Sequence, residues 1–386
     1  MLRFITAGES HGYGLVVIID GVPAGLRIKE EDIDLELNRR QKGFGRGKRM
    51  AIERDHARII AGVRFGETIS SPVALLIENR DWLNWTKVMS SREEDCREVK
   101  LETAPRPGHA DLAGIMKYGR KDIRDILERA SARETAARVA AGTVFKKILS
   151  IIGIKVVSFV EQIGPEKIRG MKLDYSKAAV ISETSPLRCP DKHAEQRMVR
   201  VIQDAAVNGD TIGGKFTVAA LNVPPGLGSH AQWDKRLDGS IARAVMSIPA
   251  VKGVEFGAGF AMAAMPGSKV HDEIYYSDTK KYYRKTNNAG GVEGGITNGE
   301  HIVIHAVMKP IPSLVRPLVS VDVKSKKKVF AAKVRSDVCA VPAASVVGEA
   351  MLACALAQEI CEKFGGDTVK EIIANFSSYK KSVERL

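Results

Sequence analysis

Short segments that are apolar throughout, or that alternate between apolar and polar residues, recur along the chain. Both patterns are typical of strands in a sheet with at least one buried face. The segments predicted as strands are Leu15 to Asp20, Gly62 to Gly66, Val73 to Glu78, Ile151 to Ile163, Phe216 to Asn222 and Ile302 to Met308. These segments predict extensive sheet structure.

Longer segments between the strands carry apolar residues at helical spacing. We predict helices at Glu31 to Arg40, Ser131 to Ile148, Asp191 to Asn208, Leu237 to Met246 and Ser345 to Phe364. Ser131 and Glu134 have the spacing of a capping box, so Ser131 is predicted to be the N-cap of its helix. Residues 81–103, which include Trp82 and Trp85, and residues 270–288 are predicted to be surface loops.

Two short motifs occur twice, in the same order. V-P-x-G-L begins at Val22 and again at Val223, and G-V-x-x-G begins at Gly62 and again at Gly291. The second pair is farther apart, and the loop around residues 270–288 accounts for the additional residues. This repeat favours one domain, residues 1–386, built from two similar sheet-and-helix halves with the central helix between them.

Composition and net charge narrow the range of ligands that the protein is expected to bind. Lys and Arg number 59 against 46 Asp and Glu, which gives a formal net charge of +13. Aromatic residues make up only 6%, and no basic run alternates with aromatic residues, so a small polyanionic substrate is favoured over nucleic acid. The dense lysine run, Lys324 to Lys328, is predicted to be a solvated loop or hairpin tip.

Cysteine usage and hydropathy indicate the cellular compartment. The five cysteines include no C-x-x-C pair, which argues against a disulfide framework or a metal site and fits a reducing compartment. No signal-peptide pattern opens the sequence, and no apolar run reaches the ~18 residues of a membrane span. We expect a soluble cytoplasmic protein without a membrane partner.

The segment from Arg106 to Gly142 concentrates arginines before the central helix. It contains His109, Asp111 and the arginines Arg106, Arg120, Arg124, Arg129 and Arg133. Backbone N–H groups at a helix N-terminus, the helix dipole and nearby guanidinium groups together favour anion binding. We predict an anion site there, with Arg124 as a solvated charge outside it.

Two glycine-rich loops add candidate chemistry. Gly8 to Gly12 presents Ser10 and His11 on a backbone that a ligand can approach closely. Arg39 to Arg49 is a basic loop able to wrap an anion, although it lacks the Walker A pattern.

The chain resembles the chorismate synthase family in seven separated motifs that occur in the family's order. They are GESHG at Gly8, RPGHAD at Arg106, RASARETAARVAAG at Arg129, AVKGVEFG at Ala250, AGGVEGGITNG at Ala289, KPIPS at Lys309 and RSDVCAVPA at Arg335. The resemblance implies an α+β fold, a β-α-β sandwich with helices between two antiparallel sheets, assembled as a homotetramer. It also implies 1,4-anti elimination of phosphate from 5-enolpyruvylshikimate 3-phosphate, giving chorismate, with reduced FMN required and no net redox change.

The family's functional residues match positions of this chain. The resemblance implies substrate-binding roles for Arg40, Arg46, Arg49, Arg106, Arg133 and Arg335. It implies flavin contacts for Arg129, Ala130, Ser131, Ala250, Gly294, Lys309, Pro310, Ile311, Pro312, Ser313 and Arg335. His11 matches the group that protonates the departing phosphate and His109 the group that protonates reduced flavin. Ser10 and Asp337 match the pair beside flavin N5 where the substrate proton is received.

Two other classes of function remain open at this point. A flavin-dependent oxidoreductase would use NAD(P)H, and the resemblance associates Arg40 and Arg46 with NADPH, which makes NADPH a candidate reductant. No G-x-G-x-x-G follows a strand, so the Rossmann fingerprint is missing. A basic nucleic-acid-binding protein would show salt-dependent affinity, and no nucleic-acid motif supports it.

Overall fold

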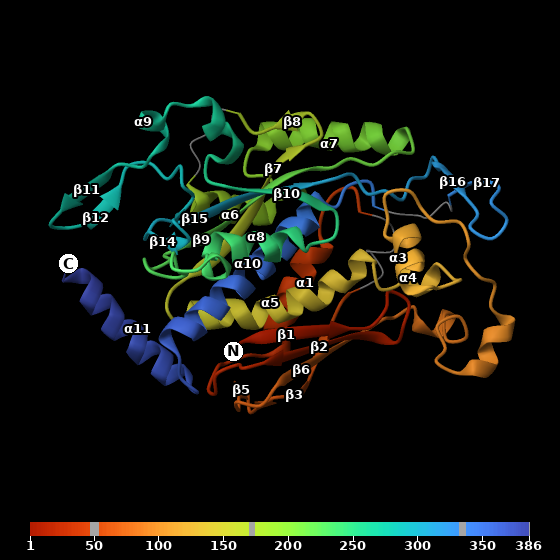
Figure 1. The fold of residues 1–386 in the computed structure, drawn as a ribbon, viewed down its shortest axis with the longest axis horizontal. Helices are drawn as coiled ribbons and strands as arrows, with labels where there is room; N and C mark the ends of the chain where they lie inside the picture. The colour runs from red at the N-terminus through yellow and green to blue at the C-terminus, as the bar shows by residue number, and fades with distance from the viewer. Residues whose placement is uncertain (47–53, 170–173, 332–336, 386) are drawn as a thin grey trace.

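Two antiparallel sheets enclose a layer of helices (Figure 1). The computed structural model describes residues 1–46, 54–169, 174–331 and 337–385. The first sheet has the strand order β1-β2-β6-β3, and the second has the order β10-β15-β9-β7-β8. One hydrophobic core contains residues of both sheets and of the helices between them. The predicted α+β sandwich is therefore confirmed.

The strands divide into two main sheets and small two-stranded sheets. The first sheet consists of β1 (Arg3–Ala7), β2 (Gly14–Asp20), β6 (Val73–Glu78) and β3 (Ala57–Ala61). The second consists of β10 (Val251–Phe256), β15 (Ile302–Met308), β9 (Gly214–Leu221), β7 (Lys155–Ile163) and β8 (Glu166–Lys167). The small pairs are β4 (Val63–Arg64) with β5 (Glu67–Thr68), β11 (Ile274–Ser277) with β12 (Lys281–Arg284), β13 (Val292–Glu293) with β14 (Ile296–Thr297), and β16 (Val319–Val321) with β17 (Lys328–Phe330).

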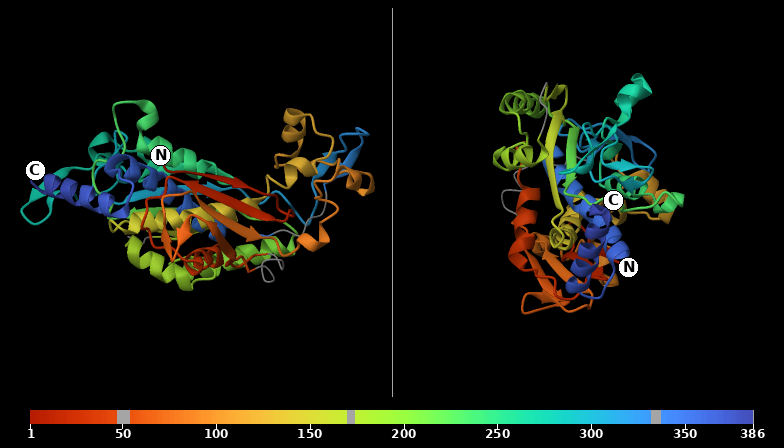
Figure 2. Two further views of the ribbon diagram at one scale, coloured as in Figure 1. Left: turned by 90° about the horizontal axis from the view of Figure 1, so that it is seen from below. Right: turned by 90° about the vertical axis from the view of Figure 1, so that its left-hand side faces the viewer.

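The helices have different positions relative to the sheets (Figures 1 and 2). The inner layer contains α5 (Thr135–Ser150) and α10 (Val341–Phe364), with α1 (Glu30–Gln41) and α8 (Leu237–Met246) packed against them. The other helices are α3 (Asp111–Tyr118), α4 (Arg124–Leu127), α6 (Tyr175–Thr184), α7 (Lys192–Val207), α9 (Gly267–Val270) and α11 (Val369–Glu384). Helices α3 and α4 lie with the β16–β17 hairpin at one end of the sandwich, and β11, β12 and α11 lie at the other.

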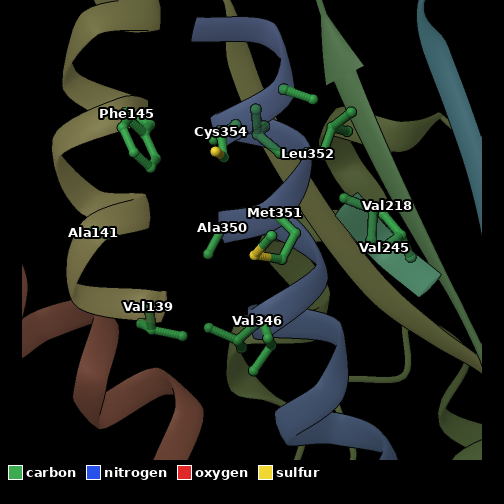
Figure 3. Packing of buried hydrophobic residues seen from close by; sticks show 14 of the residues in the cluster. Val139, Ala141, Phe145, Val218, Val245, Val346, Ala350, Met351, Leu352 and Cys354 are labelled. Carbon is green, nitrogen blue, oxygen red and sulfur yellow. The ribbon is translucent and has the colours of Figure 1, made fainter. Parts of the chain in front are cut away.

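Helices α5 and α10 pack against each other at the centre of the sandwich. In Figure 3, Ala350 on α10 points toward α5, while Val218 on β9 lies on the opposite side of α10. A Cβ added at Gly142 of α5 would lie 2.3 Å from the Cβ of Ala350. Glycine at this position therefore permits the close approach of the two helices.

We expect Gly142→Ala to lower the free energy of unfolding by about 1–3 kcal/mol, because overpacking a buried contact forces the helices apart. Gly239→Ala in α8 is the control, since a Cβ there meets nothing within 4 Å. It should stabilise the protein by about 0.5–1 kcal/mol through helix propensity and chain entropy. Urea unfolding of both variants measures the difference, and equal effects would contradict a tight contact at Gly142.

The internal repeat is confirmed at the level of individual hydrogen bonds. Thr68 on β5 donates its hydroxyl to the Pro23 carbonyl (2.6 Å) and accepts the backbone N–H three residues further along. Thr297 on β14 makes the same two bonds to the turn at Pro224 (2.7 Å). The orders β1-β2-β6-β3 and β7-β9-β15-β10 correspond, and the inserted β11–β12 segment follows β10.

Most predicted elements are confirmed, and α8 and β15 have the predicted bounds. The lysine run from Lys324 forms the tip of the β16–β17 hairpin, as predicted. The prediction of a loop at residues 270–288 is wrong in part, because β11 and β12 pair there. Two adjacent tyrosines on each strand stabilise this hairpin through cross-strand pairs such as Tyr276 with Tyr282, a signal that the polar composition obscured.

Helix α10 begins at Val341, four residues earlier than predicted, with Pro342 in its first turn. Among the residues that the structure describes, it is the one helix long and apolar enough to cross a membrane, and 94% of the apolar window is buried in the fold. That burial is what the inner helix of a sandwich requires.

Candidate active site

Most predicted site residues lie near the end of the sandwich that carries α3 and α4. They form two groups, one around the β1–β2 loop and the N-terminal side of α5, the other around residues 106–111 and 309–313. Helix α3 follows the second group in the chain, and α4 leads into the first. The two helices pack closely, because a Cβ added at Gly114 of α3 would lie 2.4 Å from Ile126 of α4.

Two buried arginines of the first group share one carboxylate. Arg133 donates through Nη1 to Asp55 (2.6 Å), and Arg40 Nη1 lies 3.4 Å from the other oxygen of Asp55. Arg133 Nε also donates to Asn79 (3.0 Å), and Arg40 Nε donates to Thr135 at the start of α5 (2.9 Å). All three charged side chains are less than a tenth exposed.

Further charges surround Arg40. Arg46 Nε lies 3.2 Å from Asp337 Oδ2. The pKa of Arg40 is lowered to about 10, chiefly by burial. The charges of Arg46 and Arg133 lower it further, whereas Asp55 and Asp337 raise it in part. Cations this crowded gain free energy from an anionic ligand that compensates them.

The predicted helix cap is partly correct. Ser131 Oγ accepts the Arg133 N–H (3.3 Å), but it caps a 3₁₀ turn at Ala132–Glu134, and α5 begins only at Thr135. Glu134 does not complete a capping box, because its carboxylate binds Arg138 (2.9 Å). The Ser131 hydroxyl also donates to Ser10 (3.3 Å), so these two predicted site residues are in contact.

His11 is held by a side chain that the sequence did not suggest. Glu128, directly after α4, accepts the His11 backbone N–H (3.0 Å), and its Oε2 lies 2.8 Å from Nδ1 of the ring. The Glu128 carbonyl accepts the Ser10 N–H (3.0 Å). The loop that presents Ser10 and His11 is thereby tied to the turn before α5.

The second group is centred on His109. Its Nδ1 lies 3.2 Å from the Pro107 carbonyl, and its Nε2 lies 3.1 Å from the Ser313 hydroxyl. A carbonyl only accepts, so Nδ1 carries the hydrogen. Burial lowers the pKa of His109 below its ordinary value, and the charges of Arg106 and Lys309 lower it further. The hydrogen bond to Pro107 and the charge of Asp111 raise the pKa but do not offset this.

The other predicted residues of this group are packed together. Arg106 pairs with the fully buried Asp111 (2.8 Å), and Lys309 Nζ donates to the Gly108 carbonyl (2.6 Å). The Lys309 N–H donates to the carbonyl of Ala250, which has a left-handed φ of 68°. The same segment contains Pro310, Ile311, whose carbonyl accepts the Thr211 hydroxyl, and Pro312, whose Cβ would lie 2.7 Å from a Cβ added at Gly108.

The remaining predicted flavin contacts are Arg129, Ala130 and Gly294. Arg129 donates to the Thr6 and Gly8 carbonyls (both 2.9 Å), so its guanidinium holds β1 to the loop before α5; its flavin contact stays a prediction. Ala130 continues the same turn. Gly294 lies in the β13–β14 turn, toward the end of the sandwich away from α3 and α4 (Figure 1), so the structure does not bring it to the other residues.

Arg124 is not the solvated charge that was predicted. Its side chain is 16% exposed and binds Glu102 (3.2 Å) and Glu128 (3.4 Å). The predicted residues Arg49 and Arg335 lie outside the residues that the structure describes.

Sequence reasoning missed Asp55, Asn79, Glu128 and Trp85 as members of the site. Asp55 and Asn79 are isolated polar residues at strand boundaries, with no periodic signal. Trp85 was predicted only to belong to a surface loop, yet its ring stacks on His11 with 4.0 Å between centroids. These contacts join residues far apart in sequence, so local patterns do not encode them.

Comparison with known proteins gives one consistent result. The family model described as chorismate synthase matches residues 2–361. The chorismate synthase of Aquifex aeolicus (strain VF5) is 54% identical over 394 residues, covering 99% of this chain and 98% of the relative. That of Endomicrobium trichonymphae is 53% identical, with both chains fully covered. A crystal structure of a chorismate synthase matches with a TM-score of 0.82 and 46% identity, covering 100% of this chain and 99% of that one.

The sandwich fold, the arginines and two histidines at one end of it, and the matches to known proteins define an enzyme that acts on a small molecule. The chain belongs to the chorismate synthase family, over nearly its whole length.

Proposed function

We propose that the protein is a lyase of aromatic amino acid biosynthesis, the shikimate pathway. It eliminates phosphate from 5-enolpyruvylshikimate 3-phosphate in a 1,4-anti sense to give chorismate, with reduced FMN bound beside the substrate. The observation that carries this proposal is the crowding of Arg40, Arg46 and Arg133 in one buried cluster. The substrate has two carboxylates and a phosphate, and FMN adds a second phosphate, so the ligands supply the compensating anions.

The residues present fit the cofactor. Arg106 and Lys309 lie near His109, and Arg129 lies beside the β1–β2 loop, so the two groups supply cations that suit the flavin phosphate. When bound, reduced FMN supplies transient electron density that eases loss of phosphate, without net redox change. The protein then has to bind, orient and move protons.

Proton handling is assigned to the two histidines. His11 delivers a proton to the departing phosphate oxygen, and Ser10 with Asp337 lies on the route by which the ring proton leaves. His109 holds a proton next to the cofactor at Nε2, where Ser313 is its neighbour. Anionic ligands near Arg106 and Lys309 oppose the effect that lowers the pKa of His109, so ligand binding favours its protonated form.

The decisive experiment supplies 5-enolpyruvylshikimate 3-phosphate with chemically reduced FMN under anaerobic conditions and follows chorismate. We expect turnover without NADPH and none with oxidised FMN. Consumption of NADPH in proportion to product would instead support the flavin-dependent oxidoreductase. NADPH remains a candidate reductant of the bound flavin, with Arg40 and Arg46 as its proposed contacts.

We also propose a homotetramer in the cytoplasm, with neither nucleic acid nor membrane as a partner. Sedimentation of the purified protein tests the assembly, and a stable monomer at micromolar concentration would contradict it.

Replacing His11 or His109 with alanine should lower turnover by roughly 10- to 10³-fold, the usual scale for loss of a general acid. FMN and substrate affinity should change little, because the arginines recognise the anions. His230→Ala, at an exposed histidine, is the matched control. Single-turnover kinetics and FMN titrations measure the two effects separately. Loss of FMN binding with unchanged single-turnover chemistry would show that the proton roles are wrong.

A further inference from the structure

His11 is fixed through both its backbone and its ring. Glu128 accepts the His11 N–H with one carboxylate oxygen, and Nδ1 lies within 3.1 Å of both oxygens. The Glu128 side chain is 1% exposed and the His11 side chain 18%. A carboxylate that accepts a backbone N–H and faces a ring nitrogen at 2.8 Å requires that nitrogen to carry a hydrogen.

Two further side chains lie close to His11 or to its partner Glu128. The Trp85 ring stacks on the imidazole, with 4.0 Å between centroids and 25° between planes. The Arg124 guanidinium lies 5.5 Å from the centre of the Trp85 ring and 3.4 Å from Oε1 of Glu128. The imidazole is therefore held on its edge by a carboxylate and on its face by an indole.

We propose that Glu128 is a positioning residue that fixes the tautomer and orientation of His11, with Trp85 and Arg124 supporting it. Nδ1–H donates to Glu128, and Nε2 is the nitrogen through which His11 exchanges a proton with a reactant. This inference rests on the proposed role of His11.

The roles of the supporting residues follow from their contacts. Arg124 neutralises the buried carboxylate, which would otherwise carry an uncompensated charge. Trp85 restricts rotation of the imidazole and brings one side chain of the otherwise largely exposed 81–103 segment into the site. Neither residue needs to touch the substrate.

The test measures the tautomer directly. The ¹⁵N shifts of His11, assigned by their loss in His11→Ala, should show hydrogen on Nδ1 in the parent protein at a pH where the ring is neutral. Glu128→Ala should release this preference, whereas Glu128→Gln, which retains a carbonyl acceptor, should keep it in part. Glu102→Ala removes the other partner of Arg124 without touching His11, so it should leave the tautomer unchanged.

Turnover provides the second readout. Glu128→Ala should lower kcat by roughly 10- to 100-fold with little change in KM, the scale for a misplaced catalytic group. Glu128→Gln should lie between Ala and the parent, and it serves alone if the Ala variant fails to fold. An unchanged tautomer in both Glu128 variants would overturn the inference. A changed tautomer with full activity in His11→Ala would instead overturn the proposed role of His11 and leave the positioning intact.

Discussion

Glu349→Ala is expected to lower the free energy of unfolding by about 3–5 kcal/mol, the scale for breaking a buried ion pair. Glu349 is fully buried in α10 and pairs with Arg39 (2.8 Å), Lys146 and Arg188 (3.3 Å). Ser158 on β7 donates to the same carboxylate (2.6 Å). The substitution leaves Arg39 of α1, Lys146 of α5 and Arg188 beside the second sheet without their common partner.

Glu362→Ala is the matched control for Glu349. It lies in the same helix and pairs with Lys235, but both side chains are more than half exposed. Its effect should be within about 1 kcal/mol. Urea unfolding followed by circular dichroism measures both variants, and equal losses would show that the buried charges contribute no more than exposed ones.

The same carboxylate predicts how stability depends on pH. Burial alone would raise the pKa of Glu349, but Arg39, Lys146 and Arg188 more than offset it, so the pKa lies below its ordinary value of 4.5. The unfolded chain then binds this proton more readily, so the contribution is complete above about pH 4.5 and is lost as the pH falls. The Glu349→Ala variant should therefore lose less stability than the parent between pH 5 and pH 3.

Asp55→Ala should have the second large effect, a loss of about 3–5 kcal/mol in the ligand-free protein. Asp55 is 2% exposed and compensates Arg40 and Arg133, which have little access to water. An anion in the site can replace that carboxylate. Inorganic phosphate should therefore raise the melting temperature of Asp55→Ala more than that of the parent.

Asp20→Ala serves as the control for Asp55, because Asp20 pairs with Arg3 on the exposed surface. It should melt like the parent and respond to phosphate like the parent. Equal stabilisation of all three proteins by phosphate would contradict an anion site at Arg40 and Arg133.

The local pattern of apolar and polar residues predicted many of the strands and helices. The alternation at Ile302 to Met308 and the helical spacing at Leu237 to Met246 matched β15 and α8 because each element buries a regular face. The repeated V-P-x-G-L motif predicted two halves because each copy forms the same turn, which Thr68 and Thr297 hold. Sequence therefore predicted elements whose structure depends on near neighbours.

The site was predicted less completely, because its geometry depends on distant partners. Motifs identified Arg40, Arg133 and His11, but not the carboxylates that hold them. Asp55 and Glu128 follow no period and reach the arginines and His11 only after the sheet and helices assemble. The start of α5 was misplaced for a local reason, since Glu134 binds Arg138, four residues further along, instead of returning to Ser131.

The contact between α5 and α10 has a consequence for biosynthesis. Helix α5 ends at Ser150 and α10 begins at Val341. At translation rates of about 5–20 residues per second, roughly 10–40 s separate their emergence from the ribosome. During that interval the side of α5 that faces α10, including the surface around Gly142, lacks this native partner on the nascent chain. Chaperones that shield such surfaces should therefore increase the yield of folded protein most when translation is slow.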